Sequence, residues 1–180
     1  FKIDGPLDMS LGQTSNEKGT TAADIENHWT EQELAELIRE IGEERMAGRI
    51  AKAIVTARKG NPITRTLELA DIIVAAVPRG YERGRIHPAT RTFQALRIAV
   101  NDELGALSSA IQAAWNVLDV DGTLAIISFH SLEDRVVKFA FREPQWKALY
   151  KRPLVPTDEE IARNPRSRSA KLRAARKILV

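Results

Sequence analysis

The segment DGTLAIISFHSLEDRVVK, residues 121–138, gives the clearest indication of the fold of this chain. The turn-forming pair Asp121-Gly122 precedes an apolar run at 124–127, which predicts a short buried strand. The run ends in a cluster of hydrogen-bonding side chains: Ser128, His130, Ser131, Glu133, Asp134 and Arg135. Because ligands of open α/β sheets bind beyond the carboxyl ends of the strands, we predict a candidate site here.

The same residues also fit a purely structural interpretation. Ser131 with Asp134 three positions later has the form of a helix N-cap followed by acids in the first turn. Arg135 and Lys138 would then be solvated positions on the next helix. One set of residues can do both, so both interpretations stay open. A Ser/His/Asp triad is not expected, since no Gly-x-Ser-x-Gly surrounds the serine.

The composition is that of an ordinary globular protein, with 43% hydrophobic and 28% charged residues among 180. The longest apolar runs, 72–77 and 124–127, are too short to cross a bilayer, and no secretory signal is visible. The absence of cysteine excludes disulfides and thiolate metal sites. The three histidines are isolated from one another, so no metal site is predicted. We expect a cytoplasmic protein with no membrane partner.

Positive charge is concentrated at one end of the chain. Residues 151–180 carry nine Lys and Arg and three acidic residues, a net charge of +6, which leaves −3 for residues 1–150. A cationic end on a slightly acidic body favours a polyanionic partner, because basic side chains gain affinity by releasing phosphate counterions. The alternative is a basic terminal strand and loop that charge keeps soluble.

Three helices in succession are predicted in the first half, after a loop over residues 1–20. Thr30 to Glu33 has capping-box form and starts a helix that ends near Gly42. A second helix begins near residue 46 and stops at 60–62, and Thr66 caps a third that runs to residue 77. These helices without an intervening strand predict a helical module.

The second half reads as alternating helices and strands. His87-Pro88 opens one long helix whose apolar stripe runs from Phe93 to Leu118. The strand and helix around 122–142 are followed by a weak strand over 146–154, a helical turn at 157–163 and a last strand over 171–180. This order predicts one side of an α/β sheet.

Three further groups of residues are candidates for ligand contact. Asp4 and Asp8 on a turn could orient a base or an amine, although an Asx turn explains them as well. His87 and Arg91 lie at a predicted helix N-terminus, which suits a phosphate or carboxylate, or His87 simply caps. Arg166 and Arg168 lie among small hydroxyl residues and could follow a nucleic-acid backbone, or belong to a solvated loop.

Five segments together resemble the RsmH (MraW) family. They are DGPLDM at 4–9, GEER at 42–45 with RIA at 49–51, HPATRTFQALRI at 87–98 with VNDEL at 100–104, ISFHSLEDRVVK at 127–138 and NPRSRSAKLR at 164–173. They occur in order over nearly the whole chain at spacings similar to those of the family. The sequence MSLGQ at 9–13 departs from the family's usual continuation.

The resemblance implies an α/β, Rossmann-like methyltransferase fold with an inserted all-helical domain. Residues 1–9 would be a loop of the catalytic domain, 10–86 the helical insert, and 87–180 the C-terminal part of the catalytic domain. The family's S-adenosylmethionine loop has no counterpart here, and no Gly-x-Gly occurs. Since the chain begins Phe-Lys-Ile-Asp, we expect upstream sequence to supply that loop, and this chain alone to be inactive.

The activity implied by the resemblance is transfer of a methyl group from S-adenosylmethionine to N4 of a cytidine in the decoding region of small-subunit rRNA. The expected partner is that rRNA or the ribosomal subunit. By this hypothesis Ser128, His130, Ser131, Glu133 and Asp134 line the base side of the pocket, with Asp4 and Asp8 nearby, while Arg91, Arg135, Arg166 and Arg168 hold phosphates. The alternatives are a non-catalytic nucleic-acid-binding module, or a dimerisation module that forms a homodimer.

Overall fold

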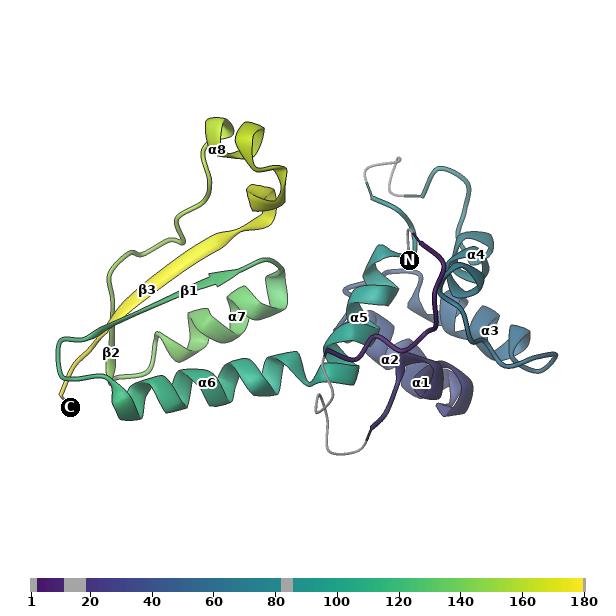
Figure 1. The fold of residues 1–180 in the computed structure, drawn as a ribbon, viewed down its shortest axis with the longest axis horizontal. Coiled ribbons are helices and arrows are strands. Elements are labelled where there is room, and N and C mark those ends of the chain that lie inside the picture. The colour runs from purple at the N-terminus through teal and green to yellow at the C-terminus, as the bar shows by residue number, and fades with distance from the viewer. Residues whose placement is uncertain (1–2, 12–18, 82–85, 180) are drawn as a thin grey trace. The chain divides into compact units, whose positions relative to one another are not determined.

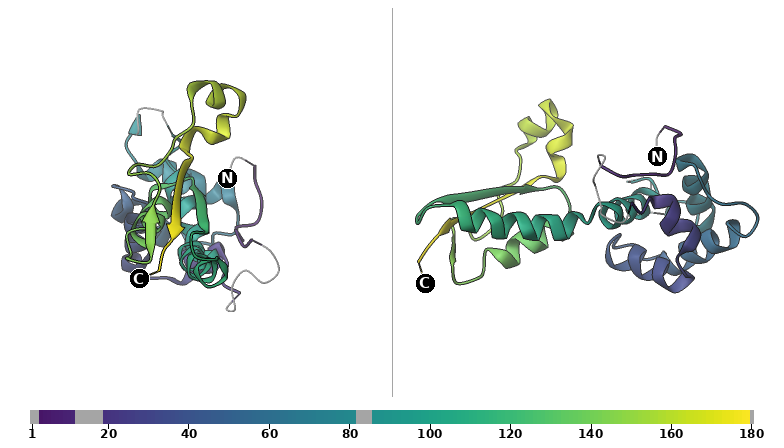
Figure 2. Two further views of the ribbon diagram at one scale, coloured as in Figure 1. Left: turned by 90° about the vertical axis from the view of Figure 1, so that its left-hand side faces the viewer. Right: turned by 60° about the horizontal axis from the view of Figure 1, so that its bottom comes forward.

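The computed structural model describes residues 3–11, 19–81 and 86–179. Packing divides the chain into two compact units, Phe1–Glu103 and Leu104–Val180, and each is described by itself. Figures 1 and 2 show the elements of both units, coloured along the chain. Among the described residues, no helix combines the length and the apolar character needed to span a membrane.

The N-terminal unit is the predicted helical module. Its helices are α1 (Ala22–His28), α2 (Glu31–Glu40), α3 (Ala47–Ala57), α4 (Thr66–Ala76) and α5 (Thr90–Asn101). One apolar face of each helix is buried in a common core that includes Leu34, Ile38, Ile50, Ile54, Ile73 and Leu96. Because α5 packs on α1 and α2, packing within the chain divides it after Glu103 rather than after residue 86. The domains predicted at 1–9, 10–86 and 87–180 are domains of the complete protein. The division by packing within this chain does not test them.

The start of α2 has the cap that the local sequence predicts, whereas at the start of α4 a tertiary contact replaces the predicted cap. Thr30 and Glu33 form the predicted capping box at the start of α2. The predicted cap at Thr66 is wrong, since Arg65 occupies the N-cap position without a side-chain hydrogen bond. The Thr66 hydroxyl instead accepts from the N–H of Gly5 and donates to the carbonyl of Ile3. The Thr66 side chain, which the local sequence pattern assigned to a helix cap, is therefore bonded to a segment about sixty residues away in sequence.

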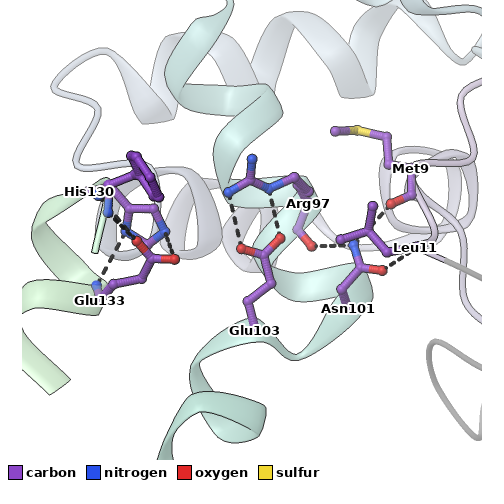
Figure 3. Close-up of polar contacts among 8 residues, drawn as sticks. Met9, Leu11, Arg97, Asn101, Glu103, His130 and Glu133 are labelled. Carbon is purple, nitrogen blue, oxygen red and sulfur yellow. Dashed lines mark hydrogen bonds and ion pairs between the residues drawn. The ribbon is translucent and has the colours of Figure 1, made fainter. Parts of the chain in front are cut away.

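The single long helix predicted from His87 is wrong, because it is interrupted at Asp102. α5 ends at Asn101, Asp102 has a left-handed backbone (φ 46°), and α6 (Glu103–Val117) follows. The Asn101 side chain donates to the Met9 carbonyl (2.9 Å) and accepts from the Leu11 N–H (2.7 Å), while Arg97 binds Glu103 through two hydrogen bonds (Figure 3). These contacts stabilise the interruption between the two helices. The apolar periodicity of the sequence continues across Asp102 and therefore does not reveal the interruption.

The C-terminal unit contains a three-stranded sheet in the order β1-β3-β2. β1 (Thr123–Ser128) and β2 (Trp146–Ala148) each pair antiparallel with β3 (Lys171–Lys177). The strands predicted at 124–127 and 171–180 are confirmed, the second to Lys177. The predicted burial of the first is wrong: β1 is an edge strand of this sheet, and Ser128 is its one buried residue. The strand predicted over 146–154 is shorter, with an isolated bridge from Leu154 to Leu172 beyond it. A mixed helix-and-sheet class is confirmed, whereas the Rossmann-like arrangement stays a prediction.

Helices α6 and α7 (Ser131–Ala140) cover one face of this sheet, as Figure 1 shows. Ile111 of α6 and Val137 of α7 are buried together with Phe141, Trp146 and Ala175. Side chains alternate along a strand, so Ile127 of β1 points to the other face, where 56% of it is exposed. The predicted turn at 157–163 is confirmed as α8 (Asp158–Arg163), capped by Thr157, and the 3₁₀ helix η2 (Pro165–Ser169) leads into β3.

Candidate functional site

The predicted polar cluster lies where β1 ends and α7 begins. Ser128 is the last residue of β1 and is buried, and its hydroxyl donates a long hydrogen bond of 3.4 Å to the carbonyl of Lys171 on β3. His130 follows in extended conformation and is the N-cap of α7. The strand therefore delivers the side chains of Ser128, His130 and Glu133 to one end of the sheet within this unit.

His130 and Glu133 cap α7 reciprocally. The Nδ1 of His130 accepts from the N–H of Glu133 (3.3 Å), and Glu133 Oε2 accepts from the N–H groups of Phe129 (2.8 Å) and His130 (3.2 Å), as Figure 3 shows in part. The predicted cap at Ser131 is wrong by one residue, since Ser131 is the first residue of the helix. The imidazole nitrogen of His130 accepts this hydrogen bond as the hydroxyl of a Ser or Thr cap would. Histidine is not among the residues preferred at N-caps, so the sequence did not predict this cap.

The second ring nitrogen of His130 is the most informative atom of the cluster. In the neutral imidazole the nitrogen that accepts is unprotonated, so the proton is on Nε2. This Nε2 is buried and has no hydrogen bond among the described residues, although Glu133 Oε1 lies 3.4 Å away in poor geometry for one. A buried donor without a hydrogen bond is costly, so its place in the cluster calls for an explanation. His130 Nε2 and Glu133 Oε1 therefore place a donor beside an acceptor at this end of β1.

Asp134 has a different environment. Its carboxylate accepts from Arg173 Nε (2.7 Å) and Nη2 (3.2 Å), and Lys171 Nζ lies 3.5 Å away. The hydrogen bonds from Arg173 hold the pKa of Asp134 below its usual value, against a smaller opposing effect of burial. A carboxylate neutralised in this way is a poor proton acceptor. The pair fixes α7 to β3, while the predicted ligand contact of Asp134 stays a prediction.

The arginines predicted to hold phosphates in this unit are on exposed elements. Arg135 is exposed on α7, and Arg166 and Arg168 are exposed on η2. η2 itself is held by Ser167, which is buried and donates to the carbonyl of Asn164 (2.8 Å). Ser167, between the two arginines, thus fixes the turn, while the guanidinium groups lie at the surface.

The remaining predicted residues belong to the N-terminal unit, and contacts within that unit explain them in part. Asp4 pairs with Arg65, whose hydrogen bond lowers the Asp4 pKa. Asp8 accepts from the N–H of Ser10 (3.0 Å), the turn contact that was the alternative for this residue, and its pKa is lowered by hydrogen bonds from Ser10. His87 accepts from the N–H of Ala89 (3.2 Å).

Arg91 lies beside Glu44, a buried acid that the sequence analysis did not predict. Its guanidinium lies 3.8 Å from the carboxylate of Glu44, which is almost fully buried. Glu44 also accepts from the Tyr81 hydroxyl and from the N–H of Met46 (2.8 Å). Arg91 is thus already partly neutralised. In the sequence Glu44 is one of several acids in a polar segment, and nothing distinguishes it as buried.

The comparison with protein families decides what kind of chain this is. The model described as the MraW methylase family matches residues 1–178. The chain belongs to the MraW methylase family. Similar proteins include those named ribosomal RNA small subunit methyltransferase H in Synechococcus elongatus (53% identical) and Deinococcus deserti (53%), of which the match covers 59% and 58% of the length. The protein of that name in Geobacter sulfurreducens is 51% identical, with 62% of its length covered.

The matches cover 99 to 100% of this chain, which spans about three fifths of the length of these curated relatives. Within this MraW-family chain, a cavity of about 400 Å³ lies between α6, α7 and β2, with Ile111, Trp115, Phe139 and Trp146 among its lining residues. None of the residues predicted to contact a ligand lines it. The predicted site is therefore the rim at the end of β1 and not this cavity.

Proposed function

We propose that the complete protein containing this chain transfers a methyl group from S-adenosylmethionine to the N4 amino group of a cytidine in the decoding region of small-subunit rRNA. Family membership and the names of the relatives support methylation of this RNA. The basic C-terminal segment supports an RNA partner. The observation that carries the proposal is the buried His130 Nε2 beside the Glu133 carboxylate.

This donor and acceptor match the edge of a cytosine. Cytosine presents an N4–H donor next to the N3 acceptor, so Glu133 Oε1 accepts from the amine while His130 Nε2–H donates to the ring. The amine is a poor nucleophile because its lone pair is delocalised into the ring. Holding its N–H on the Glu133 carboxylate would orient the nitrogen and stabilise the positive charge that develops as the N4–C bond forms and the S–C bond of the methyl donor breaks. The carboxylate would then take the N4 proton. Ser128 and Ser131 complete the base side of the pocket.

The residues in this chain do not fit the cofactor's side of such a site. Dinucleotide and S-adenosylmethionine cradles use glycines whose backbone a ligand approaches closely. Among the glycines whose surroundings the structure describes, Gly42 and Gly122 are crowded by protein backbone. An added Cβ would lie 2.4 Å from the Ile38 carbonyl oxygen and 2.8 Å from that of Asp119, respectively. When bound, the cofactor supplies the methyl group. We propose that its main contacts lie outside these 180 residues and that this chain alone does not transfer methyl groups.

The other parts of the proposal concern the RNA and the fold. Arg91, Arg135, Arg166 and Arg168 contact phosphates, with Asp4 and Asp8 near the base. Residues 10–86 form a helical domain inserted into a Rossmann-like catalytic domain to which 87–180 belong. The complete protein acts in the cytoplasm, where small subunits are assembled.

The test measures N4-methylcytidine by mass spectrometry in small-subunit rRNA treated with the complete protein and S-adenosylmethionine. Two substitutions keep the cap of α7 intact: His130→Asn, because Asn is a good N-cap, and Glu133→Gln, because Gln serves at the third position of a capping box. Each is expected to lower kcat on the order of tenfold or more without lowering the melting temperature.

Controls separate the parts of the proposal. The matched control, Thr157→Asn, exchanges the cap of α8 in the same way and is expected to leave the rate unchanged. Unchanged rates in both α7 variants would show that this rim does not contact the base. If the wild-type complete protein binds the RNA and no methylated cytidine forms, the non-catalytic nucleic-acid-binding module is the better explanation.

A further inference from the structure

A small hollow in the C-terminal unit is lined by basic side chains from three parts of the chain. Its volume is about 110 Å³, and its lining includes Lys138 of α7 and Arg142 just beyond that helix, Tyr150 and Lys151 of the segment after β2, and Arg173 of β3. We call these five residues the basic hollow. The buried ring of Phe141 also lines it, so a firm apolar side chain lies among the cations.

Most of the charge in the basic hollow is not neutralised by the protein. Arg173 is bound to Asp134. In the described part of the chain, neither Lys138 nor Lys151 has an acidic oxygen within ion-pair distance, and the Arg142 guanidinium lies 5.8 Å from the ring centroid of Phe139. Glu143, next in sequence to Arg142, lines the separate cavity of about 400 Å³.

Helix electrostatics account for only part of this arrangement. Lys138 lies in the last turn of α7 and Arg142 just beyond it, and cations are favoured there by the helix dipole whether or not a ligand binds. Lys151 belongs to no helix and comes from another part of the chain. Bringing like charges together costs free energy, which a bound anion would recover. The convergence of Lys151 with Lys138 therefore points to an anionic ligand.

Tyr150 indicates which anion. Half of this side chain is exposed, at 50%, beside the lysines. An exposed aromatic ring among cations is typical of surfaces that bind single-stranded nucleic acid, where bases stack on rings while the groove follows the backbone. The volume is well below the roughly 300–1,000 Å³ of pockets that enclose small molecules, so it suits one phosphate group and not a whole nucleotide.

We propose that the basic hollow binds one backbone phosphate of single-stranded RNA and that Tyr150 stacks on the adjacent base. This inference rests on the proposed function, which supplies the RNA. The hollow would be a contact separate from the rim at the start of α7, and it would place a segment of the substrate strand along the edge of the sheet at β2.

The experiment measures binding of the complete protein to a fluorescent single-stranded RNA with the decoding-region sequence, by anisotropy at several salt concentrations. The double variant Lys138→Ala/Lys151→Ala is expected to raise Kd about tenfold near 0.15 M salt and to reduce the salt slope by about 0.7, the contribution of one single-strand phosphate contact. Lys52→Ala/Lys59→Ala, which removes two exposed lysines of the N-terminal unit, is the matched control and should change neither quantity.

The stacking contact has its own pair of variants. Tyr150→Ala is expected to raise Kd about fivefold or more, whereas Tyr150→Phe keeps the ring face and binds as wild type does. A Kd and salt slope unchanged by Lys138→Ala/Lys151→Ala would overturn the proposal. So would normal RNA binding with a loss of affinity only for the assembled subunit, since the hollow would then contact an acidic protein surface. Absence of N4-methylcytidine with wild-type protein would instead count against the proposed function, whatever the variants bind.

Discussion

The guanidinium of Arg173 on β3 binds the carboxylate of Asp134 on α7 through two hydrogen bonds, of 2.7 and 3.2 Å. Both side chains are largely buried, with 14% and 13% of their surfaces exposed. The pair joins the helix that carries His130 and Glu133 to the last strand of the sheet. The position of the candidate site therefore depends on a contact between residues 39 apart in sequence.

Removing one partner of this pair is expected to destabilise the C-terminal unit. Asp134→Asn should lower the free energy of unfolding by about 1 kcal/mol at pH 7, since a charge-assisted pair is lost and part of its strength is screened by solvent. The Asp134 pKa is lowered in the folded protein, so this stabilisation is complete above the ordinary value of 3.8 and is lost as pH falls through the lowered pKa. Urea unfolding of both proteins at pH 7 and pH 3 checks this; a difference that grows on acidification would contradict it.

Glu26 predicts the opposite pH dependence in the N-terminal unit. It is fully buried, both carboxylate oxygens have no hydrogen bond among the described residues, and burial raises its pKa to about 8 against the weaker effect of Arg58. The folded state thus retains a proton that the unfolded state loses near pH 4.5, so stability falls as pH rises from about 4.5 to 8. Glu26→Gln should remove this slope in urea unfolding at several pH values. Glu31→Gln, at an exposed position of α2, should keep it.

The cap of α7 can be tested apart from any chemistry. His130→Ala removes the acceptor for the Glu133 N–H and should cost about 1 kcal/mol of stability, whereas His130→Asn should cost little. Thermal unfolding followed by circular dichroism provides the measurement. Equal melting temperatures for the Ala variant and wild type would mean that the imidazole does not act as the cap.

Gly42 separates α2 from the next helix and is required by close packing. A Cβ there would lie 2.4 Å from the Ile38 carbonyl oxygen and 2.9 Å from that of Arg91. Gly42→Ala should therefore destabilise the unit by about 1–3 kcal/mol. Gly48→Ala is the matched control: it lies in α3 with no neighbour within 4 Å, and Ala should stabilise the helix by about 0.5–1 kcal/mol. Chemical denaturation of both variants would show whether the two shifts have opposite signs.

Elements determined by local pattern could be predicted from the sequence. The strand at β1, the capping box at Thr30 and the turn capped by Thr157 each depend on neighbouring residues, and the structure has all three. The polar cluster after β1 was also visible, because a strand that ends in so many hydrogen-bonding groups is unusual. Which of its members remain available to a ligand could not be predicted: Asp134 is bound to a residue far along the chain, while His130 has a free ring nitrogen among the described residues.

The family, the helical module and the polar cluster after β1 could be predicted from the amino-acid sequence, because they depend on motifs and on periodicity along the chain. The break at Asp102, the burial of Glu26 and Glu44, and the proximity of Lys138 and Lys151 become visible in the folded chain alone. Each of these arises from segments distant in sequence that share one hydrogen bond, one core or one hollow. Local patterns carry no information about such contacts, since the free energy that selects them is gained only when the segments pack.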